Sequence, residues 1–190
     1  MNKLHLCCGD VYLKGYENLD IQGTLVEKAS PEAIAGNETT LEKYFKYNFG
    51  SPRRDVIVDG FLNLNLPWDG IEDDTIDEIV MVSSIEHFTL QEAEFIMEEC
   101  KRVLKSGGVL KIDFPDVIAS IDRYIDERPD FAMQLIYCNH KNEYSVHKWG
   151  YVPETFLELL GEGWEDTQFG ANSIVKHDYP MIGFTARRVK

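Results

Sequence analysis

Residues 4–21, LHLCCGDVYLKGYENLDI, contain two apolar β-type runs joined by a very short connection. The first run leads into 7–10, CCGD, and the second ends with the carboxylate of Asp20. The six residues between Gly9 and Tyr16 allow little more than one turn, at a helical rise of about 1.5 Å per residue. The stretch therefore predicts strand, glycine turn, strand and acid, with no room for a crossover helix.

Downstream of this stretch, further β-type runs alternate with helical ones. The predicted strands are 3–7, 16–21, 55–61, 76–84 and 109–114. The clearest helix is 89–108, where Thr89 and Glu92 form a capping box and Gly107 with Gly108 supplies the stop. Strands separated by helices in this way predict βαβ crossovers and a mainly parallel sheet.

The C-terminal third adds helices and then a change of strand direction. The predicted helices are 116–127, 130–138 and 153–163. The runs 164–170 and 180–188 have no helix between them, so we expect an antiparallel pair. The fold class predicted is α/β: a Rossmann-like, doubly wound, mainly parallel sheet with an antiparallel C-terminal strand pair.

Composition limits the functions that the chain can have. Its 190 residues predict one domain, 1–190, in which the polar stretch 22–54 is an insertion with one helix, 40–47, and a candidate cap over a ligand. A net charge of −14 argues against nucleic-acid or membrane partners. Four cysteines without CxxC spacing, and no signal or membrane-spanning run, predict a reduced, cytoplasmic protein. The oligomeric state stays open.

Ligand-binding candidates follow the strands, because open parallel sheets bind ligands beyond the carboxyl ends of their strands. Asp20 is placed to accept a ribose hydroxyl, although an ordinary turn residue would look the same. Gly9 permits close approach of a ligand, and Asp59 with Phe61 suits a nucleobase. The full predicted set is Cys8, Gly9, Asp10, Asp20, Asp59, Phe61, Ser83, Ser84 and His87.

The order of these motifs resembles that of class I S-adenosylmethionine-dependent methyltransferases. The resemblance rests on LHLCCGD…GYENLD, on DGFLNLNLPWDGIEDDTIDEIVMVSSIEHF and on ECKRVLKSGGVLKIDFPD, and more loosely on 147–169. The likeness is greatest to a small branch with the same shortened connection after the first strand. It implies S-adenosylmethionine as cofactor and transfer of its methyl group to oxygen or nitrogen of a small-molecule or saccharide-type acceptor.

The first motif differs from the family pattern. His5 stands at the acid position, Cys7 at the first glycine and Val11 at the third, so only Gly9 remains. A second hypothesis is therefore a non-catalytic module that binds S-adenosylmethionine or another nucleoside. A nicotinamide-dependent reductase is disfavoured, because CCGDVY is not GxGxxG and no helix follows to hold a pyrophosphate.

A base is required if the acceptor is a hydroxyl or a protonated amine. The acid–base candidates are Glu86, His87, Asp113, Asp116, His140 and His147. We place His147 first as the catalytic base, because the His-, Asn- and Tyr-rich segment 140–151 should reach the pocket mouth. Glu86 and His87 suit packing or helix capping, and His140 suits a solvated loop. No metal site is predicted, since no cysteine or histidine pair has ligand spacing.

Overall fold

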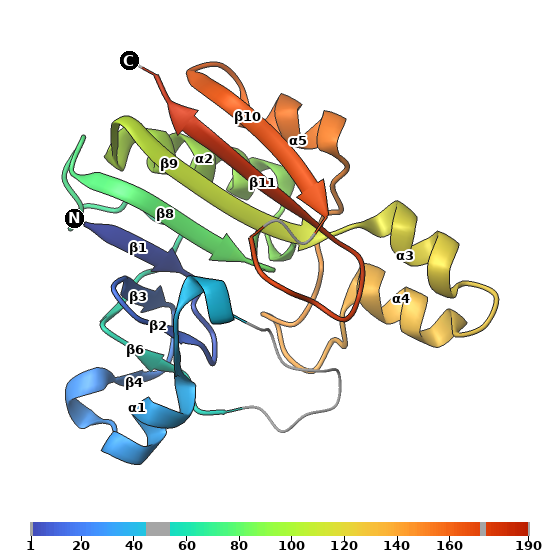
Figure 1. Cartoon of the computed structure of the whole chain (residues 1–190), viewed down its shortest axis with the longest axis horizontal. Helices are drawn as coiled ribbons and strands as arrows, with labels where there is room; N and C mark the ends of the chain where they lie inside the picture. Colours follow the sequence, from blue (N-terminus) through green and yellow to red (C-terminus); the bar gives the residue numbers. More distant parts are fainter. Residues whose placement is uncertain (1, 45–53, 172–173, 190) are drawn as a thin grey trace.

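A seven-stranded sheet of order β10-β11-β9-β8-β1-β3-β7 runs through the protein (Figure 1). The computed structural model describes residues 2–44, 54–171 and 174–189. The parallel strands are β1 (Lys3–Leu6), β3 (Glu17–Asp20), β7 (Gly60–Phe61), β8 (Ile76–Val82) and β9 (Leu104–Pro115). The antiparallel strands are β10 (Trp164–Ala171) and β11 (Met181–Arg188). This confirms the predicted sheet and its C-terminal pair.

Strand order reverses at β1, which lies between β3 and β8. Chain connections leave β1 toward β3 and β7 on one side, and return to β8 and β9 on the other. Such a switch point leaves a crevice at the carboxyl ends of the strands, where ligands bind in open α/β sheets. The fold therefore directs the search for a site to the residues after β1, β3 and β8.

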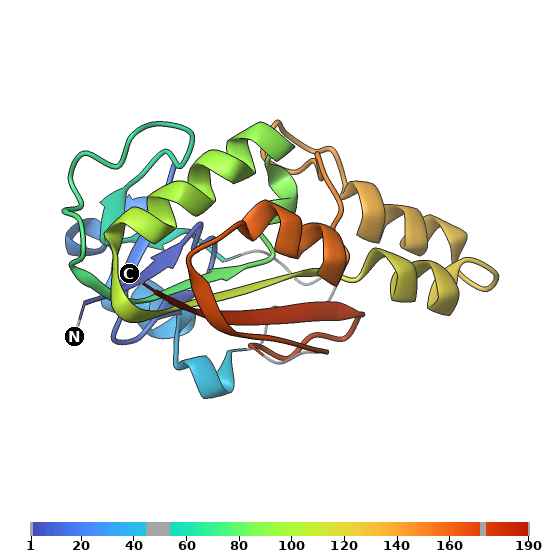
Figure 2. The same ribbon diagram turned by 90° about the horizontal axis from the view of Figure 1, so that it is seen from above.

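One face of the sheet is covered by α2 (Leu90–Val103) and α5 (Pro153–Leu160), which lie side by side (Figure 2). Helix α2 begins with the predicted capping box: Glu92 N donates to Thr89 Oγ1 at 3.3 Å, and Thr89 N donates to Glu92 Oε2 at 2.7 Å. Its apolar stripe is buried, at Ala93, Ile96, Met97, Cys100 and Val103. Helical periodicity thus places this face against β8 and β9 in the main core.

The opposite face carries a second, smaller apolar cluster. It consists of Val11, Leu13, Tyr44, Val80, Val82 and Val175. Val11 and Leu13 belong to the short connection after β1, which forms β2 (Tyr12–Leu13) paired with β5 (Glu38–Thr39). The predicted absence of a helix between β1 and β3 is confirmed within this fully described segment. The connection covers the sheet directly with its own apolar side chains.

The polar stretch 22–54 forms short elements, where it is described. They are β4 (Thr24–Leu25), η1 (Val26–Lys28), α1 (Pro31–Asn37), β5 and η2 (Leu41–Lys43). The predicted helix 40–47 is wrong for its first part, because η2 is a single 3₁₀ turn that ends at Tyr44 in extended backbone. The rest of that prediction, 45–47, lies outside the described residues.

The predicted strand 55–61 is divided into two strands with different partners. Ile57–Val58 forms β6 and pairs with β4, whereas Gly60–Phe61 forms β7 and pairs with β3. Asp59 lies between them and its N–H donates to Asn18 O at 2.8 Å. The run of β-branched residues predicts extended backbone correctly, but it does not reveal that the chain changes sheets at Asp59.

Glycines 107 and 108 do not end helix α2, which corrects the predicted helix end. The helix ends at Val103, and Leu104 already has extended backbone and begins β9. In the pairing with β8, Leu104 lies opposite Ile76 and Val109 opposite Glu78, so 105–108 form a bulge. Gly107 has φ +77°, which suits this bulge because glycine accepts the left-handed region.

Two helices project past the carboxyl ends of the strands (Figures 1 and 2). They are α3 (Val117–Tyr124) and α4 (Pro129–Tyr137), both close to their predicted ranges. Asp116 caps α3, since Ala119 N donates to Asp116 Oδ1 at 2.9 Å. Among the helices described, none is both long and apolar enough to cross a lipid bilayer.

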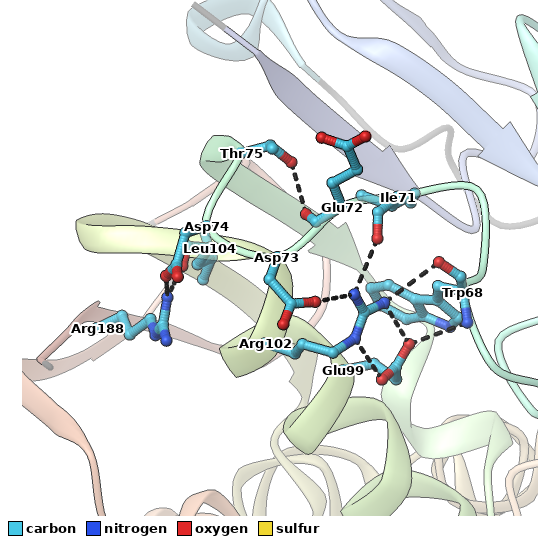
Figure 3. A network of polar contacts seen from close by, with 10 residues as sticks. All are labelled: Trp68, Ile71, Glu72, Asp73, Asp74, Thr75, Glu99, Arg102, Leu104 and Arg188. Carbon is cyan, nitrogen blue, oxygen red and sulfur yellow. Dashed lines mark hydrogen bonds and ion pairs between the residues drawn. The ribbon is translucent and has the colours of Figure 1, made fainter.

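The connection from β7 to β8 is held against α2 by Arg102 (Figure 3). Its guanidinium donates to Glu99, to Asp73 and to the carbonyls of Ile71 and Trp68, at 2.6–3.2 Å. Trp68 N donates in turn to Glu99 Oε2 at 2.9 Å, and the Trp68 side chain is fully buried. This network fixes the second half of a connection whose first half, 62–65, reaches the pocket described below.

Candidate active site

A pocket of about 1090 Å³ opens at the carboxyl edge of the sheet. Its lining comes from the segments after β1, β3, β7 and β8, and from α4 and the loop 138–148. Ligand pockets usually measure about 300–1,000 Å³. The pocket is thus at the upper end of the usual range, and it extends from the strand ends to the loop 138–148.

The strand-end half of the pocket is built around Gly9 and Asp20. Gly9 has φ +57°, and a Cβ added there would meet no atom within 4 Å. Its N–H donates to Asp20 Oδ2 at 2.9 Å, while Asp20 Oδ1 accepts from Ile21 N at 2.8 Å. Oδ1 also accepts from Gln22 N at 3.4 Å, whereas Oδ2 has a further acceptor site for a ligand hydroxyl. The two predicted residues therefore come together beside open space.

Cys8 and Asp10 also line this half of the pocket. The Cys8 side chain is buried, and its Sγ lies 3.7 Å from Ile57 O. Burial, followed by the nearby Asp20, raises the pKa of the Cys8 thiol, so this cysteine is neutral at physiological pH and is no nucleophile. Asp10 accepts from the backbone N–H of Arg54 at 3.3 Å, which joins the end of the insertion to the loop after β1.

Asp59 and Phe61, which were predicted to contact a nucleobase, are not among the residues that line the pocket. Asp59 Oδ1 accepts from Tyr12 Oη at 2.6 Å, and Oδ2 accepts from Asn18 N at 2.7 Å and Nδ2 at 3.1 Å. Phe61 is 56% exposed. The carboxylate is directed into the connection after β1 because β6 and β7 pair with different strands.

The pocket residues that follow β7 are instead 62–65, Leu-Asn-Leu-Asn. They are not among the predicted site residues. Asn63 Oδ1 accepts from Asn65 N at 3.0 Å, which shapes this turn, and Leu64 is buried. These residues could have been predicted from their position directly after a strand, because the carboxyl ends of neighbouring parallel strands lie at one edge of the sheet.

Ser83 and Ser84 line the pocket at the end of β8. Ser83 has φ +47°, and Cys7, at the end of the adjacent β1, has φ +50°. Left-handed backbone at non-glycine residues costs about 1–3 kcal/mol and is concentrated at functional sites. Ser83 N donates to Asp113 O at 2.9 Å and to Oδ1 at 3.1 Å, which holds this turn in place.

The other half of the pocket brings Glu86, His87 and His147 together. Glu86 and His87 lie in η3 (Ile85–His87), directly after β8. The rings of His87 and His147 meet edge to face, with centroids 4.7 Å apart. His147 Nε2 lies 3.9 Å from Glu86 Oε1, and the Glu86 side chain is 3% exposed. This pairing joins residues 60 positions apart, so no local spacing in the sequence could have revealed it.

The loop that carries His147 is fastened to η3 through its backbone. Lys148 N and Trp149 N both donate to Glu86 O, at 2.8 and 3.2 Å. Lys148 Nζ also contacts Glu92 Oε2, at 3.1 Å, near the start of α2. The predicted approach of segment 140–151 to the pocket is therefore found for Lys141–Ser145, His147 and Lys148.

The remaining acid–base candidates lie elsewhere. His140 is exposed and is not among the lining residues. Asp113 is fully buried beneath the Ser83 turn, and Asp116 caps α3. Tyr151 packs against Phe114 and Phe156 in the core, where burial raises the pKa of its phenol. These groups hold the framework of the site.

Comparison with known proteins agrees with this architecture. The family model of a methyltransferase domain matches residues 51–112. A protein from Pyrococcus horikoshii OT3 is similar in structure, with 15% identity over 98% of this chain and 81% of that one, and a TM-score of 0.56. A search of curated proteins gave no match.

Two further solved structures are similar over nearly the whole chain. One is an S-adenosylmethionine-dependent methyltransferase from Methanosarcina mazei, 14% identical over 99% of this chain and 92% of that one, TM-score 0.54. The other is a possible histamine N-methyltransferase from Thermotoga maritima, 13% identical over 98% and 82%, TM-score 0.53. At these identities, the structures show a shared fold. The methyltransferase-domain match over residues 51–112 agrees with this fold, so in its architecture the chain is similar to S-adenosylmethionine-dependent methyltransferases.

Proposed function

We propose that this enzyme transfers a methyl group from S-adenosylmethionine to an oxygen or nitrogen of a small-molecule or saccharide-type acceptor. The observation that carries the proposal is that Asp20 and His147 line one and the same pocket. The volume of about 1090 Å³ accommodates a nucleoside cofactor and a second ligand together. Methyl transfer requires both partners to be held in line within one cavity.

The cofactor belongs at the strand-end half. Asp20 would accept from ribose hydroxyls, and the Gly9 turn would let the ligand approach the backbone closely. The turns at Cys7 and Ser83, which border the same space, would flank it. When bound, the cofactor supplies an activated methyl group on a sulfonium. The chain supplies orientation, and the acidic side chains Asp10 and Asp20 suit a ligand that carries positive charge.

The acceptor belongs beneath the loop 138–148, next to His147. The Nδ1 atom of His147 lies 3.1 Å from the carbonyls of Leu135 and Ile136. Because carbonyl oxygens only accept, Nδ1 carries the ring hydrogen, and Nε2 is left as a base. An acceptor hydroxyl would give its proton to Nε2 as the oxygen attacks. Glu86, 3.9 Å from Nε2, would stabilise the imidazolium that forms.

Two measurements test this proposal. Calorimetry with S-adenosylhomocysteine and with NAD should show binding of the first only. Incubation with methyl-labelled S-adenosylmethionine and a panel of small hydroxyl and amine compounds, including sugars, should then yield labelled product and S-adenosylhomocysteine in equal amounts. Binding of NAD without a response to either sulfur nucleoside would contradict the proposal.

A non-catalytic nucleoside-binding module is the second candidate, and a feature of the first motif favours it. Cys7 occupies a left-handed conformation that glycine would adopt without strain, and its side chain borders the pocket. This makes the loop bulkier than a glycine-rich one. The two candidates differ in turnover: S-adenosylhomocysteine binding with no labelled product from any acceptor class would favour the module.

A further inference from the structure

The cluster of Glu86, His87 and His147 has a feature that the proposed function does not use. Each offers one ligand atom, and the three atoms lie within 4.8 Å of one another. Two histidines with one carboxylate form a ligand set used by catalytic zinc sites and by other divalent transition metals. The residues come from η3 and from the loop 138–148, so the fold and not a local motif assembles the set.

Both histidines are held in the tautomer that metal binding needs. His87 Nδ1 lies 3.0 Å from Val146 O, and His147 Nδ1 lies 3.1 Å from the carbonyls of Leu135 and Ile136. Each Nδ1 therefore carries a hydrogen, and in the neutral ring the lone pair is on Nε2. Metal-ligating histidines almost always donate their other ring N–H to a carbonyl, carboxylate or water. In this protein, backbone carbonyls accept the Nδ1–H hydrogen bond of both histidines.

Glu86 is the buried member of the cluster. It is 2% exposed, so solvent would screen little of the attraction between its carboxylate and a divalent ion. Its Oε1 lies 3.9 Å from His147 Nε2, which is longer than a hydrogen bond. Tetrahedral ligand atoms at about 2.0–2.1 Å from zinc stand roughly 3.3 Å apart, so a metal would draw atoms that now lie within 4.8 Å of one another closer by up to about 1.5 Å.

We propose that Glu86, His87 and His147 form a binding site for one divalent transition metal, with zinc as the preferred ion over magnesium or calcium. Imidazole nitrogens favour zinc and its neighbours, whereas magnesium and calcium favour oxygen ligands alone. All three residues line the pocket, so the remaining coordination position faces the acceptor half. Three protein ligands and one open position are typical of a catalytic metal site.

The binding of the metal is independent of the proposed function, but its role rests on that function. An acceptor hydroxyl bound at the open position would lose its proton to solvent more readily, because a divalent metal lowers the pKa of bound oxygen. Its oxygen would then form the new bond to the methyl carbon as the carbon–sulfur bond breaks, with the electron pair remaining on sulfur. When the metal is bound, His147 Nε2 is one of its ligands and cannot act as the base. The metal then activates the acceptor hydroxyl in place of His147.

The experiment uses the full chain, stripped with a chelator and titrated with zinc alone. Calorimetry should show one zinc per chain. His87→Ala and His147→Ala should each weaken binding by more than the roughly 10–100-fold that loss of an outer-shell partner costs. His140→Asn is the matched control: this histidine is exposed, lies outside the pocket lining, and should leave zinc affinity unchanged.

A second measurement on the unaltered chain covers the case in which a variant fails to fold. Nitrogen-15 spectra of the imidazoles should show two of the five histidines shifting at Nε2 when zinc is added. Cobalt substitution should give visible absorption without a thiolate charge-transfer band, which excludes the cysteines as ligands. No saturable binding, or binding that involves thiolates and leaves both histidine signals unmoved, would overturn the proposal. S-adenosylhomocysteine binding is measured separately, so failure of the metal site and failure of the proposed function are distinguishable.

Discussion

The Nε2 atom of His177 lies 2.9 Å from Oδ2 of Asp113, and both side chains are fully buried. Because a carboxylate only accepts, His177 donates this hydrogen bond. The other oxygen of Asp113 accepts from Ser83 N at 3.1 Å. One carboxylate thus ties the segment before β11 to the strained turn at the end of β8, and the pocket edge depends on a residue that never reaches the pocket.

Loss of this pair should destabilise the fold strongly. His177→Ala leaves a buried carboxylate without its partner, which should lower the free energy of unfolding by about 2–4 kcal/mol. Urea denaturation measures the change. Asp178→Asn, on the exposed neighbour, is the control and should have little effect. If both variants unfold at the same urea concentration as the parent chain, the buried pair has no stabilising role.

Asp20→Ala should weaken binding of S-adenosylhomocysteine about ten-fold or more, because hydrogen bonds to a charged group contribute roughly 1.5–3 kcal/mol. Calorimetry on the folded variant gives the dissociation constant. Asp20→Asn separates two effects, since the amide oxygen can still accept from Gly9 N, whose bond to Asp20 is 2.9 Å long. An unchanged dissociation constant for S-adenosylhomocysteine in both variants would mean that Asp20 only shapes the turn and does not bind the cofactor.

Asp59→Ala should lower the stability of the fold and leave the affinity for S-adenosylhomocysteine nearly unchanged. The substitution removes the acceptor of Tyr12 Oη and of Asn18 N, so we expect about 1.5–3 kcal/mol lower stability. Affinity for S-adenosylhomocysteine should stay within about three-fold of the parent value, or about 0.7 kcal/mol, because Asp59 does not line the pocket. A large loss of affinity in a stable variant would restore the nucleobase role that the sequence suggested.

The network around Arg102 should make stability fall at low pH. The side-chain hydrogen bond from Arg102 holds the pKa of Glu99 below its usual range (Figure 3). When the pKa of a carboxyl is lower in the folded protein than in the unfolded chain, where it is about 4.3, its ionised form stabilises the fold. This contribution is fully present above the unfolded pKa and is lost as the pH falls through the pKa of the folded protein. The stability difference between the parent chain and Glu99→Gln should therefore shrink from about pH 6 to about pH 3.

Urea unfolding of both proteins at several pH values measures this difference. Glu98→Gln is the matched control, because Glu98 is 70% exposed and pairs with Lys101 on the helix surface. Exposed pairs of this kind contribute little. A stability difference for Glu99→Gln that is constant across the pH range would show that the Glu99 carboxylate is not stabilised by Arg102.

The sequence predicted most of the sheet because its signals are local. The apolar run of β8 and the periodicity and capping box of α2 need no knowledge of distant residues. The errors arise where a partner decides the outcome: Asp59 is turned inward because β6 and β7 pair with different strands. The meeting of His87 with His147 likewise depends on how the loop 138–148 folds back, and ligand spacing along the chain could not reveal it.

His147→Ala should separate turnover from cofactor binding in the metal-free protein. If Nε2 is the base, turnover should fall by roughly 10²–10⁴-fold while affinity for S-adenosylhomocysteine is unchanged. The ring lies at the acceptor half, against Glu86 and the carbonyls of Leu135 and Ile136, away from the Asp20 end of the pocket lining. His140→Asn should retain full turnover, since this histidine is exposed and outside that lining.

The acceptor's own chemistry gives a further check on the base. A hydroxyl acceptor needs its proton removed, so the loss on His147→Ala should be large at neutral pH and should shrink as rising pH ionises the acceptor without help. An acceptor that is already deprotonated should show a much smaller loss at every pH. The measurement is the ratio of parent to variant turnover across the pH range, with one hydroxyl and one neutral amine acceptor. Equal losses for both acceptors at all pH values would mean that His147 only positions the acceptor and removes no proton.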